Sequence, residues 1–155
     1  MSKEIVLGTA HIFNWFNLGA AINHPEAGRI LDLSESINQE LHIPDADVKI
    51  MPYNGYGDAG VVRWVMETQK PDAIMIFTDP RYWVWLFQME HELRQVVPII
   101  YYSLWDDLPV PLYNKPYYQS CDALFGISKQ SHGIHRECIG EENCELITFE
   151  KLVNA

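Results

Sequence analysis

Basic residues are scarce in this sequence: 11 Lys and Arg stand against 21 Asp and Glu, which gives a formal net charge of −10. A field of this sign repels the phosphates of nucleic acids and the headgroups of anionic lipids. The sequence therefore predicts no nucleic-acid partner, and the simplest interpretation of the charge is a solvated acidic surface.

Cysteine is also scarce, and long hydrophobic runs are missing. Three Cys, an odd number, do not make the disulfide framework of a small secreted protein. No stretch approaches the roughly 18 apolar residues of a membrane span, and residues 1–8 do not have the pattern of a signal peptide. We therefore expect a cytoplasmic protein with no membrane span.

Two nucleotide-binding fingerprints are missing as well. No G-x-G-x-x-G follows the first predicted strand, residues 54–57 (NGYG) lack its third Gly, and there is no Walker A loop. NAD and ATP therefore have little support as ligands, and no cofactor is predicted for this chain.

Apolar and aromatic residues are plentiful. The 155 residues are 48% hydrophobic and 12% aromatic, which is enough for the core of a single domain over residues 1–155. Large aromatic side chains fill cores, and they also form platforms for sugars or partner surfaces. The apolar segment 83–89 is best interpreted as core, with an interface to a second domain or to a second copy of the chain as the alternative.

Short apolar runs alternate with segments of helical periodicity along the chain. A loop is expected over 11–24, and a helix is expected to begin at Pro25 and to stop before Pro44. This alternation predicts an α/β fold, Rossmann-like, with a mainly parallel sheet of about six strands and helices on both faces. The expected strands are 5–10, 48–53, 73–77, 98–102, 122–127 and 145–149, and the later helices are 59–66, 81–95, 114–120 and 129–138.

The carboxyl ends of the predicted strands are rich in Gly, Asn, Asp, Ser and aromatic residues. Ligands of open parallel sheets bind at this edge, so we expect a polar, aromatic-lined cleft there. The adjacent carboxylates of Asp106 and Asp107 could accept hydrogen bonds from sugar hydroxyls or act as a base, and they are the predicted catalytic residues. The predicted ligand-binding residues are Gly8, His11, Gly19, Asn54, Tyr56, Asp79, Arg81, Trp105, Ser128 and Lys129.

Each of these assignments has a plainer alternative. Asp79 and Ser128 are suited to cap the helices that follow them, and Asp106 and Asp107 could cap or be solvated. Arg81 opposes the dipole of its predicted helix, which hints at an anionic partner.

The helix predicted at 129–138 carries three residues of types that bind metals. His132, His135 and Cys138 recur every three residues, with Cys144 beyond. This spacing spreads the side chains around the helix, and no C-x-x-C pair accompanies them, so no metal is predicted.

Two segments resemble a known family. Residues 97–107 (VPIIYYSLWDD) and 117–129 (YYQSCDALFGISK) look like the N-terminal half of GT-B glycosyltransferases of the retaining, group-1 type. In that family a fourth strand ends in a His-Asp loop, where this chain has Trp105 and Asp106. A later element leads through Ser-Lys into a helix, as Ser128 and Lys129 do here.

The resemblance implies that this domain holds a sugar or a glycosylated acceptor. In the family a second Rossmann-like domain binds the nucleotide-sugar donor, so the chain is expected to lack the donor site and to be inactive without that domain. The alternative is a stand-alone Rossmann-like binding or interaction module without catalysis. A receiver-like switch is disfavoured because residues 8–11 (GTAH) offer no acidic cluster.

Overall fold

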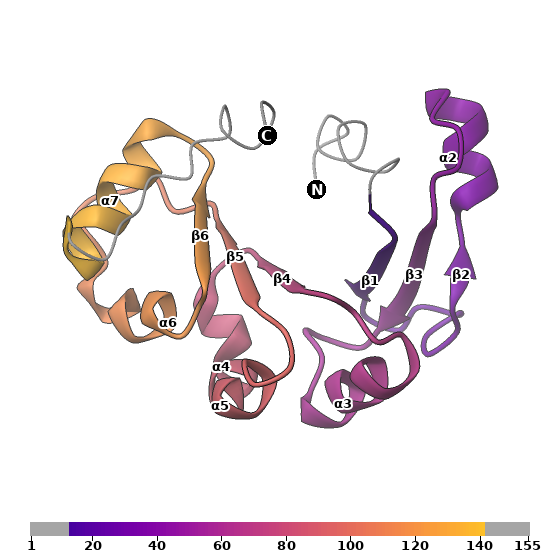
Figure 1. Ribbon diagram of the computed structural model, residues 1–155, viewed down its shortest axis with the longest axis horizontal. Coiled ribbons are helices and arrows are strands. Elements are labelled where there is room, and N and C mark those ends of the chain that lie inside the picture. Colours follow the sequence, from indigo (N-terminus) through magenta and orange to yellow (C-terminus); the bar gives the residue numbers. More distant parts are fainter. Residues whose placement is uncertain (1–12, 142–155) are drawn as a thin grey trace. The chain divides into compact units, whose positions relative to one another are not determined.

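The computed structural model describes residues 13–141, and the chain divides into two compact units, one up to Val62 and one from Arg63. The predicted α/β class is confirmed (Figure 1). Where about six strands in one sheet were expected, the described residues form two sheets of three strands. The strands predicted at 5–10 and 145–149 lie outside the described residues, and the single-domain assignment stays a prediction.

The sheet of the first unit is mixed. It contains β1 (Trp15–Ala20), β2 (Leu31–Asp32) and β3 (Val48–Tyr53) in the order β1-β3-β2. β1 runs parallel to β3 and β2 antiparallel to it. The strand predicted at 48–53 is confirmed.

The prediction of a loop over 11–24 is wrong for residues 15–20, which form strand β1. Residues 15–20 (WFNLGA) contain Asn17 and Gly19, which weaken a strand pattern, but all six residues pair with β3, from Trp15 opposite Val48 to Ala20 opposite Tyr53. Pairing with a strand far along the chain overrides the local preference. A Cβ at Gly19 would lie 3.0 Å from Cδ1 of Ile50, the tip of a side chain that can shift.

The helix predicted from Pro25 is also wrong at its start, since α2 spans only Ser34–Leu41. Gly28 has a φ of +81°, outside the helical region, and residues 31–32 are taken by β2. Asp32 then accepts the N–H of Ser34 at 2.9 Å. The end of the helix is as predicted: His42 adopts a left-handed conformation shortly before Pro44.

Helix α3 (Ala59–Thr68) begins as predicted. The carboxylate of Asp58 accepts the N–H of Val61 at 2.9 Å and so caps the first turn. The division between the two units falls within this helix.

The sheet of the second unit is entirely parallel. Strands β4 (Ile74–Phe77), β5 (Ile99–Ser103) and β6 (Ala123–Gly126) lie in that order, with β5 in the middle. The three strands predicted in this region are confirmed. Alternate residues of β5 (Ile99, Tyr101 and Ser103) are buried, as expected for a central strand.

Between β4 and β5, one continuous helix over 81–95 was predicted, and this is wrong. The segment forms the 3₁₀ helix η1 (Pro80–Trp83) and the short helices α4 (Val84–Phe87) and α5 (Glu90–Leu93). Trp83 and Met89 leave helical geometry with φ values of −108° and −112°. The indole of Trp83 donates to the carbonyl of Phe77 at 2.8 Å, which draws the chain back to β4.

The remaining helices agree with the sequence. The 3₁₀ helix η2 (Leu112–Asn114) leads into α6 (Lys115–Gln119), and α7 (Lys129–Ile139) follows β6. Among the helices that the structure describes, none has both the length and the apolar character needed to cross a membrane.

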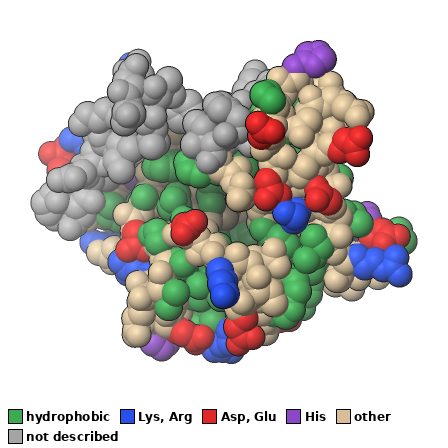
Figure 2. Space-filling view, turned by 45° about the vertical axis from the view of Figure 1, so that its right-hand side comes forward, with side chains coloured by type: hydrophobic (Ala, Val, Ile, Leu, Met, Phe, Trp, Pro, Cys, Tyr) green, Lys and Arg blue, Asp and Glu red, His purple; other side chains and the backbone are tan. Residues whose placement is uncertain are grey.

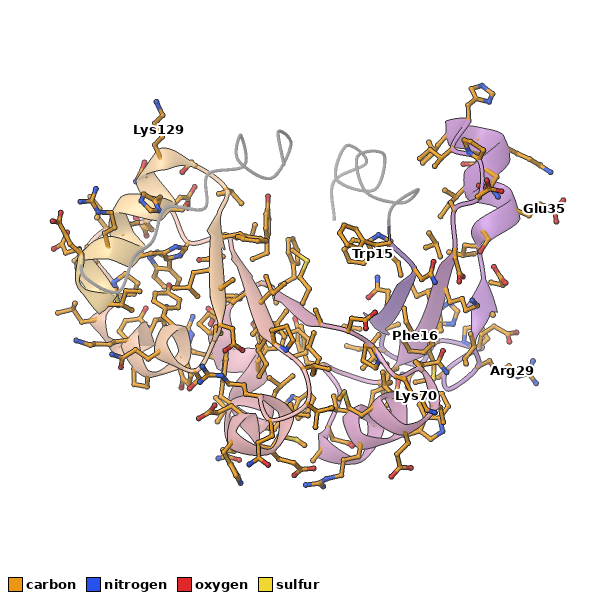
Figure 3. All side chains as sticks on the ribbon, viewed as in Figure 1. Trp15, Phe16, Arg29, Glu35, Lys70 and Lys129 are labelled. Carbon is orange, nitrogen blue, oxygen red and sulfur yellow. The ribbon has the colours of Figure 1, made fainter. Side chains whose placement is uncertain are left out.

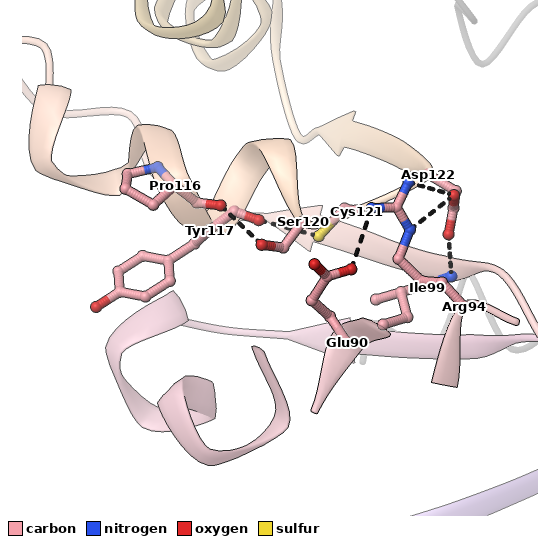
Figure 4. Close-up of polar contacts among 8 residues, drawn as sticks. All are labelled: Glu90, Arg94, Ile99, Pro116, Tyr117, Ser120, Cys121 and Asp122. Atoms are coloured by element: carbon pink, nitrogen blue, oxygen red, sulfur yellow. Dashed lines mark hydrogen bonds and ion pairs between the residues drawn. The ribbon is translucent and has the colours of Figure 1, made fainter. Parts of the chain in front are cut away.

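Asp122 joins the starts of two strands to a helix (Figure 4). Its carboxylate accepts the N–H of Ile99 at 2.8 Å, and its own N–H donates to the carbonyl of Ile99 at 2.8 Å. The other carboxylate oxygen accepts from Nε and Nη2 of Arg94 at 3.0 and 2.8 Å. Burial raises the pKa of Asp122, but these hydrogen bonds outweigh it, so the pKa is lowered.

Rings from β5, α6 and α7 pack against one another. Tyr101 and Tyr118 stack at 5.8 Å, and His135 meets the Tyr118 ring edge-on at 5.0 Å. His135 is 1% exposed, and its Nε2 has no hydrogen-bond partner within the described residues. Burial, with a smaller effect of His132, lowers the pKa of His135 to about 4.

We predict that His135 makes the fold acid-sensitive. Because the unfolded chain binds this proton more readily than the folded chain, stability is full above about pH 6.5 and falls towards about pH 4, by up to about 3 kcal/mol. His135→Phe keeps an edge-on ring and should remove most of this loss. Urea unfolding at about pH 7 and about pH 4.5 measures this difference in the free energy of unfolding.

The exposed His91 provides the matched control, since His91→Gln removes a histidine that is not buried. An unchanged pH dependence in His135→Phe would contradict the prediction.

Candidate functional site

A hollow of about 270 Å³ lies at the carboxyl ends of β4 and β5 in the second unit. Its size is close to the lower end of the range for ligand pockets, about 300–1,000 Å³. It suits a small ligand better than a dinucleotide. The residues that line it are Thr78, Asp79, Tyr101, Leu104, Trp105, Asp106 and Asp107.

A contact between β5 and the residue that follows β4 joins two lining residues of the hollow. Tyr101 on β5 is 1% exposed, and its hydroxyl donates to the carbonyl of Thr78 at 2.6 Å. Thr78 has a φ of +82°, a strained conformation for a β-branched residue. Burial raises the pKa of Tyr101, so this hydroxyl remains a donor at neutral pH.

Asp79 has the capping role that its plainer interpretation predicted. Its carboxylate accepts the backbone N–H of Arg81 at 2.9 Å. The guanidinium of Arg81 also binds both oxygens, with Nε 2.9 Å from Oδ1 and Nη2 2.5 Å from Oδ2. These hydrogen bonds lower the pKa of Asp79. The structure thus gives the charge of Arg81 a partner, and Arg81 itself does not line the hollow.

Trp105 is fixed within the loop that follows β5. Its backbone N–H donates to Oγ of Ser103 at 3.4 Å, and its indole Nε1 donates to the carbonyl of Asp107 at 3.0 Å. Its ring meets Tyr113 at 6.0 Å and an interplanar angle of 82°. The indole is therefore a preorganised wall of the hollow, with its polar atom already satisfied.

Asp106 and Asp107 differ in what holds them. The carbonyl of Asp106 accepts from Gln130 on α7 at 2.5 Å. Its carboxylate makes no hydrogen bond or ion pair with any residue in the described part of the chain. The carboxylate of Asp107 accepts the N–H of Leu108 at 2.8 Å. Of the two, Asp106 is thus the one whose carboxylate is without a partner among residues 13–141.

Ser128 is the N-cap of α7, since its hydroxyl accepts the N–H of Ser131 at 3.1 Å. The plainer interpretation of Ser128 is therefore confirmed. Lys129 follows at the first position of the helix, and its side chain projects away from the ribbon (Figure 3). Neither residue lines the hollow.

Asn54 lies in a second hollow, within the first unit, of about 360 Å³. Its side-chain oxygen accepts the N–H of Asn23 at 2.9 Å, and nearby the Tyr53 hydroxyl donates to Asp58 at 2.7 Å. Tyr56 is 38% exposed and does not line this hollow. The residues of this hollow are Ala27, Gly28, Tyr53, Asn54, Gly57 and Asp58.

Of the predicted residues, the structure brings Asp79, Trp105, Asp106 and Asp107 together. Gly8 and His11 lie outside the described residues. Sequence reasoning missed Thr78, Tyr101 and Leu104 as lining residues, and Gln130 as a support of the loop. Position beside Asp79 could have indicated Thr78, but Tyr101 lies within an apolar strand and carries no local signal.

No group of three or more His, Cys, Asp or Glu side chains is arranged to hold a metal ion in residues 13–141. Of the four possible metal ligands on and after α7, Cys144 lies outside this range. His135 and Cys138 are buried against α6 and the preceding loop, where Cys138 contacts the carbonyl of Pro111 at 3.5 Å.

Comparison of the chain with protein-family models, with curated proteins and with solved structures finds no match. The site is therefore interpreted from its own geometry.

Helix α7 is seated closely against the end of β6. A Cβ added to Gly126 would lie 3.0 Å from the backbone N of His132 and 3.0 Å from Cβ of Ser131. The backbone of a helix start cannot give way as the tip of a long side chain can. Gly126 therefore allows the close approach that brings Gln130 to the loop after β5.

We predict that Gly126→Ala destabilises the fold by about 1–3 kcal/mol, because the new methyl group overpacks this contact. Gly133→Ala, within α7, is the matched control: nothing lies within 4 Å of its added Cβ. Ala is the better helix former, so this variant should gain up to about 1 kcal/mol. Urea or thermal unfolding measures the stability of both variants. Equal effects on stability would contradict the close packing of α7 against the end of β6.

Proposed function

We propose that this chain is the acceptor-binding domain of a GT-B-like glycosyltransferase, with the acceptor sugar in the hollow at the ends of β4 and β5. The observation that carries the proposal is the meeting of one fixed indole, Trp105, with the carboxylates of Asp106 and Asp107 in one small hollow. Aromatic rings pack against the C–H face of a sugar, and carboxylates accept from its hydroxyls.

The fold supports the same proposal. Strands β4, β5 and β6 are parallel and joined by helical segments, as in half of a Rossmann-like domain. The hollow lies at the carboxyl ends of these strands, the edge where such folds bind ligands. The segments that resemble the family, 97–107 and 117–129, supply β5, β6 and the loop with Trp105.

In this proposal the two carboxylates have different tasks. Asp106 accepts the hydrogen bond, and in the reaction the proton, of the acceptor hydroxyl, because its carboxylate is free of other partners in the described chain. Asp107 shapes the loop through Leu108. The acceptor oxygen forms a bond to the anomeric carbon of the donor, and the nucleoside diphosphate leaves.

The nucleotide-sugar donor belongs, in the same proposal, to a second Rossmann-like domain that closes over the acceptor and excludes water. This division matches the hollow, which is too small for a nucleotide-sugar and has carboxylates where a diphosphate would need donors. The alternative is a stand-alone module that binds a sugar in the same hollow without catalysis. A second domain encoded beside this chain favours the enzyme.

We predict that Trp105→Ala weakens saccharide binding at least about tenfold, because it removes the apolar platform. Trp105→Phe keeps an aromatic surface and should retain most of the affinity, which separates loss of the platform from loss of the fold. Saturation-transfer NMR with a panel of methyl glycosides and disaccharides measures binding. A panel in which no saccharide binds the natural chain would contradict the proposal.

We also predict that nucleotide-sugars do not stabilise this chain by itself. A ligand present at about 100 times its Kd stabilises a fold by about 2.7 kcal/mol, which thermal unfolding detects easily. UDP- and GDP-sugars should leave the melting temperature unchanged, with an acceptor saccharide as the positive comparison. A clear increase with one of them would place the donor in this domain and overturn the assignment to the acceptor.

A further inference from the structure

The charge balance around the hollow in the second unit indicates which sugars it can accept. Three of its lining residues are aspartates, and no basic residue lines it. Asp79 is neutralised by Arg81, whose guanidinium binds both of its oxygens. Two carboxylates, those of Asp106 and Asp107, are therefore left without a cation, since neither forms an ion pair within the described residues.

Lys115 and Arg94, the basic residues nearest in the sequence, do not line the hollow, and Arg94 pairs with Glu90 and Asp122. The Nε and Nη2 atoms of Arg81 donate to the carboxylate of Asp79, and Arg81 does not line the hollow. Lys129 projects away from the ribbon at the start of α7 (Figure 3). The contact from α7 to the loop is made by the neutral amide of Gln130, which donates to the carbonyl of Asp106.

The net charge of the chain has the same sign as this local balance. The formal net charge of the chain is −10. On the face that Figure 2 shows, acidic side chains are spread over the described surface with basic ones between them, and no basic patch gathers there. An anion that approaches the hollow thus meets repulsion at long range and again at contact.

We propose that the hollow selects an uncharged sugar ring and rejects uronic acids, sialic acids and sugar phosphates. This inference rests on the proposed function and adds the class of acceptor. The hydroxyls of a neutral ring can donate to the two carboxylates, and its apolar face can pack on Trp105. An additional carboxylate or phosphate would instead lie beside two like charges, with no cation among the described lining residues to offset them.

The repulsion between one sugar anion and two carboxylates about 5 Å away in water corresponds to about a tenfold loss of affinity. The test compares D-glucose, D-galactose and D-mannose with their uronic acids and with their phosphate esters at the primary hydroxyl. Dissociation constants are measured by NMR titration of the natural chain at low salt. The neutral member of each set should bind at least about tenfold more tightly than its anionic partners.

A double variant identifies the cause. Asp106→Asn with Asp107→Asn removes both charges and keeps an oxygen that can accept from Leu108, and it should narrow the difference between neutral and anionic sugars about tenfold. Glu67→Gln with Asp72→Asn is the matched control, because it removes two exposed charges of the same unit that do not line the hollow. This control should keep the full preference for neutral sugars.

Salt provides a second readout that a purely structural role would not change. Raising the salt concentration from about 0.02 M to about 0.5 M screens repulsion between exposed charges. The anionic sugars should therefore gain affinity relative to their neutral partners in the natural chain but not in the Asp106, Asp107 double variant.

The outcomes separate the two proposals. If neutral and anionic sugars bind equally well, or the anions bind better, the selection for an uncharged ring is overturned and the acceptor site stands. If none of the sugars binds, the acceptor site is overturned and the selection with it. If the control variant loses the preference as fully as the Asp106, Asp107 variant does, the net charge of the chain, and not the hollow, is responsible, and the inference is again overturned.

Discussion

The carboxylate of Asp122 fixes the register on which the candidate site depends. Asp122 precedes β6, and it exchanges two hydrogen bonds of 2.8 Å with Ile99, the first residue of β5. Once these residues are paired, Ser103 must fall opposite Gly126 at the other ends of the strands. A shift by one residue would turn Tyr101 and Ser103 to the opposite face of the sheet. The same carboxylate binds Arg94, so the position of α5 is tied to this register as well.

The register explains why residues far apart in the sequence meet at one edge. Because Gly126 lies beside Ser103, α7 begins next to the loop that follows β5, and Gln130 can reach the carbonyl of Asp106. Gly126 has no side chain to hold the helix away. The loop is therefore supported from β5 through Ser103 and from α7 through Gln130, and Trp105 is fixed between these supports.

The sequence predicted those elements whose signal is local. Strands β4, β5 and β6 are short apolar runs with clear ends, and Asp58, Asp79 and Ser128 cap helices by contacts within a few residues. It did not predict β1, because residues 15–20 become a strand only by pairing with β3, more than thirty positions away by the register of Trp15 with Val48. The helix expected from Pro25 failed for a related reason, because β2 takes residues 31–32 for the same sheet.

The residues of the candidate site also divide into those with a local sequence signal and those without one. Asp79, Trp105, Asp106 and Asp107 could be selected because they follow strand ends, where polar and aromatic residues stand out from apolar runs. Tyr101 could not, because its hydroxyl contributes through a contact with Thr78, the residue that follows the neighbouring strand β4. The pairing of Arg81 with Asp79 did not follow from the sequence either, where the position of Arg81 only hinted at an anionic partner. This ion pair changes the charge of the site, because it offsets the carboxylate of Asp79 and leaves Asp106 and Asp107 as the acidic lining residues without an ion pair in the described chain. A ligand that donates hydrogen bonds, and does not carry negative charge, is what such a site can bind.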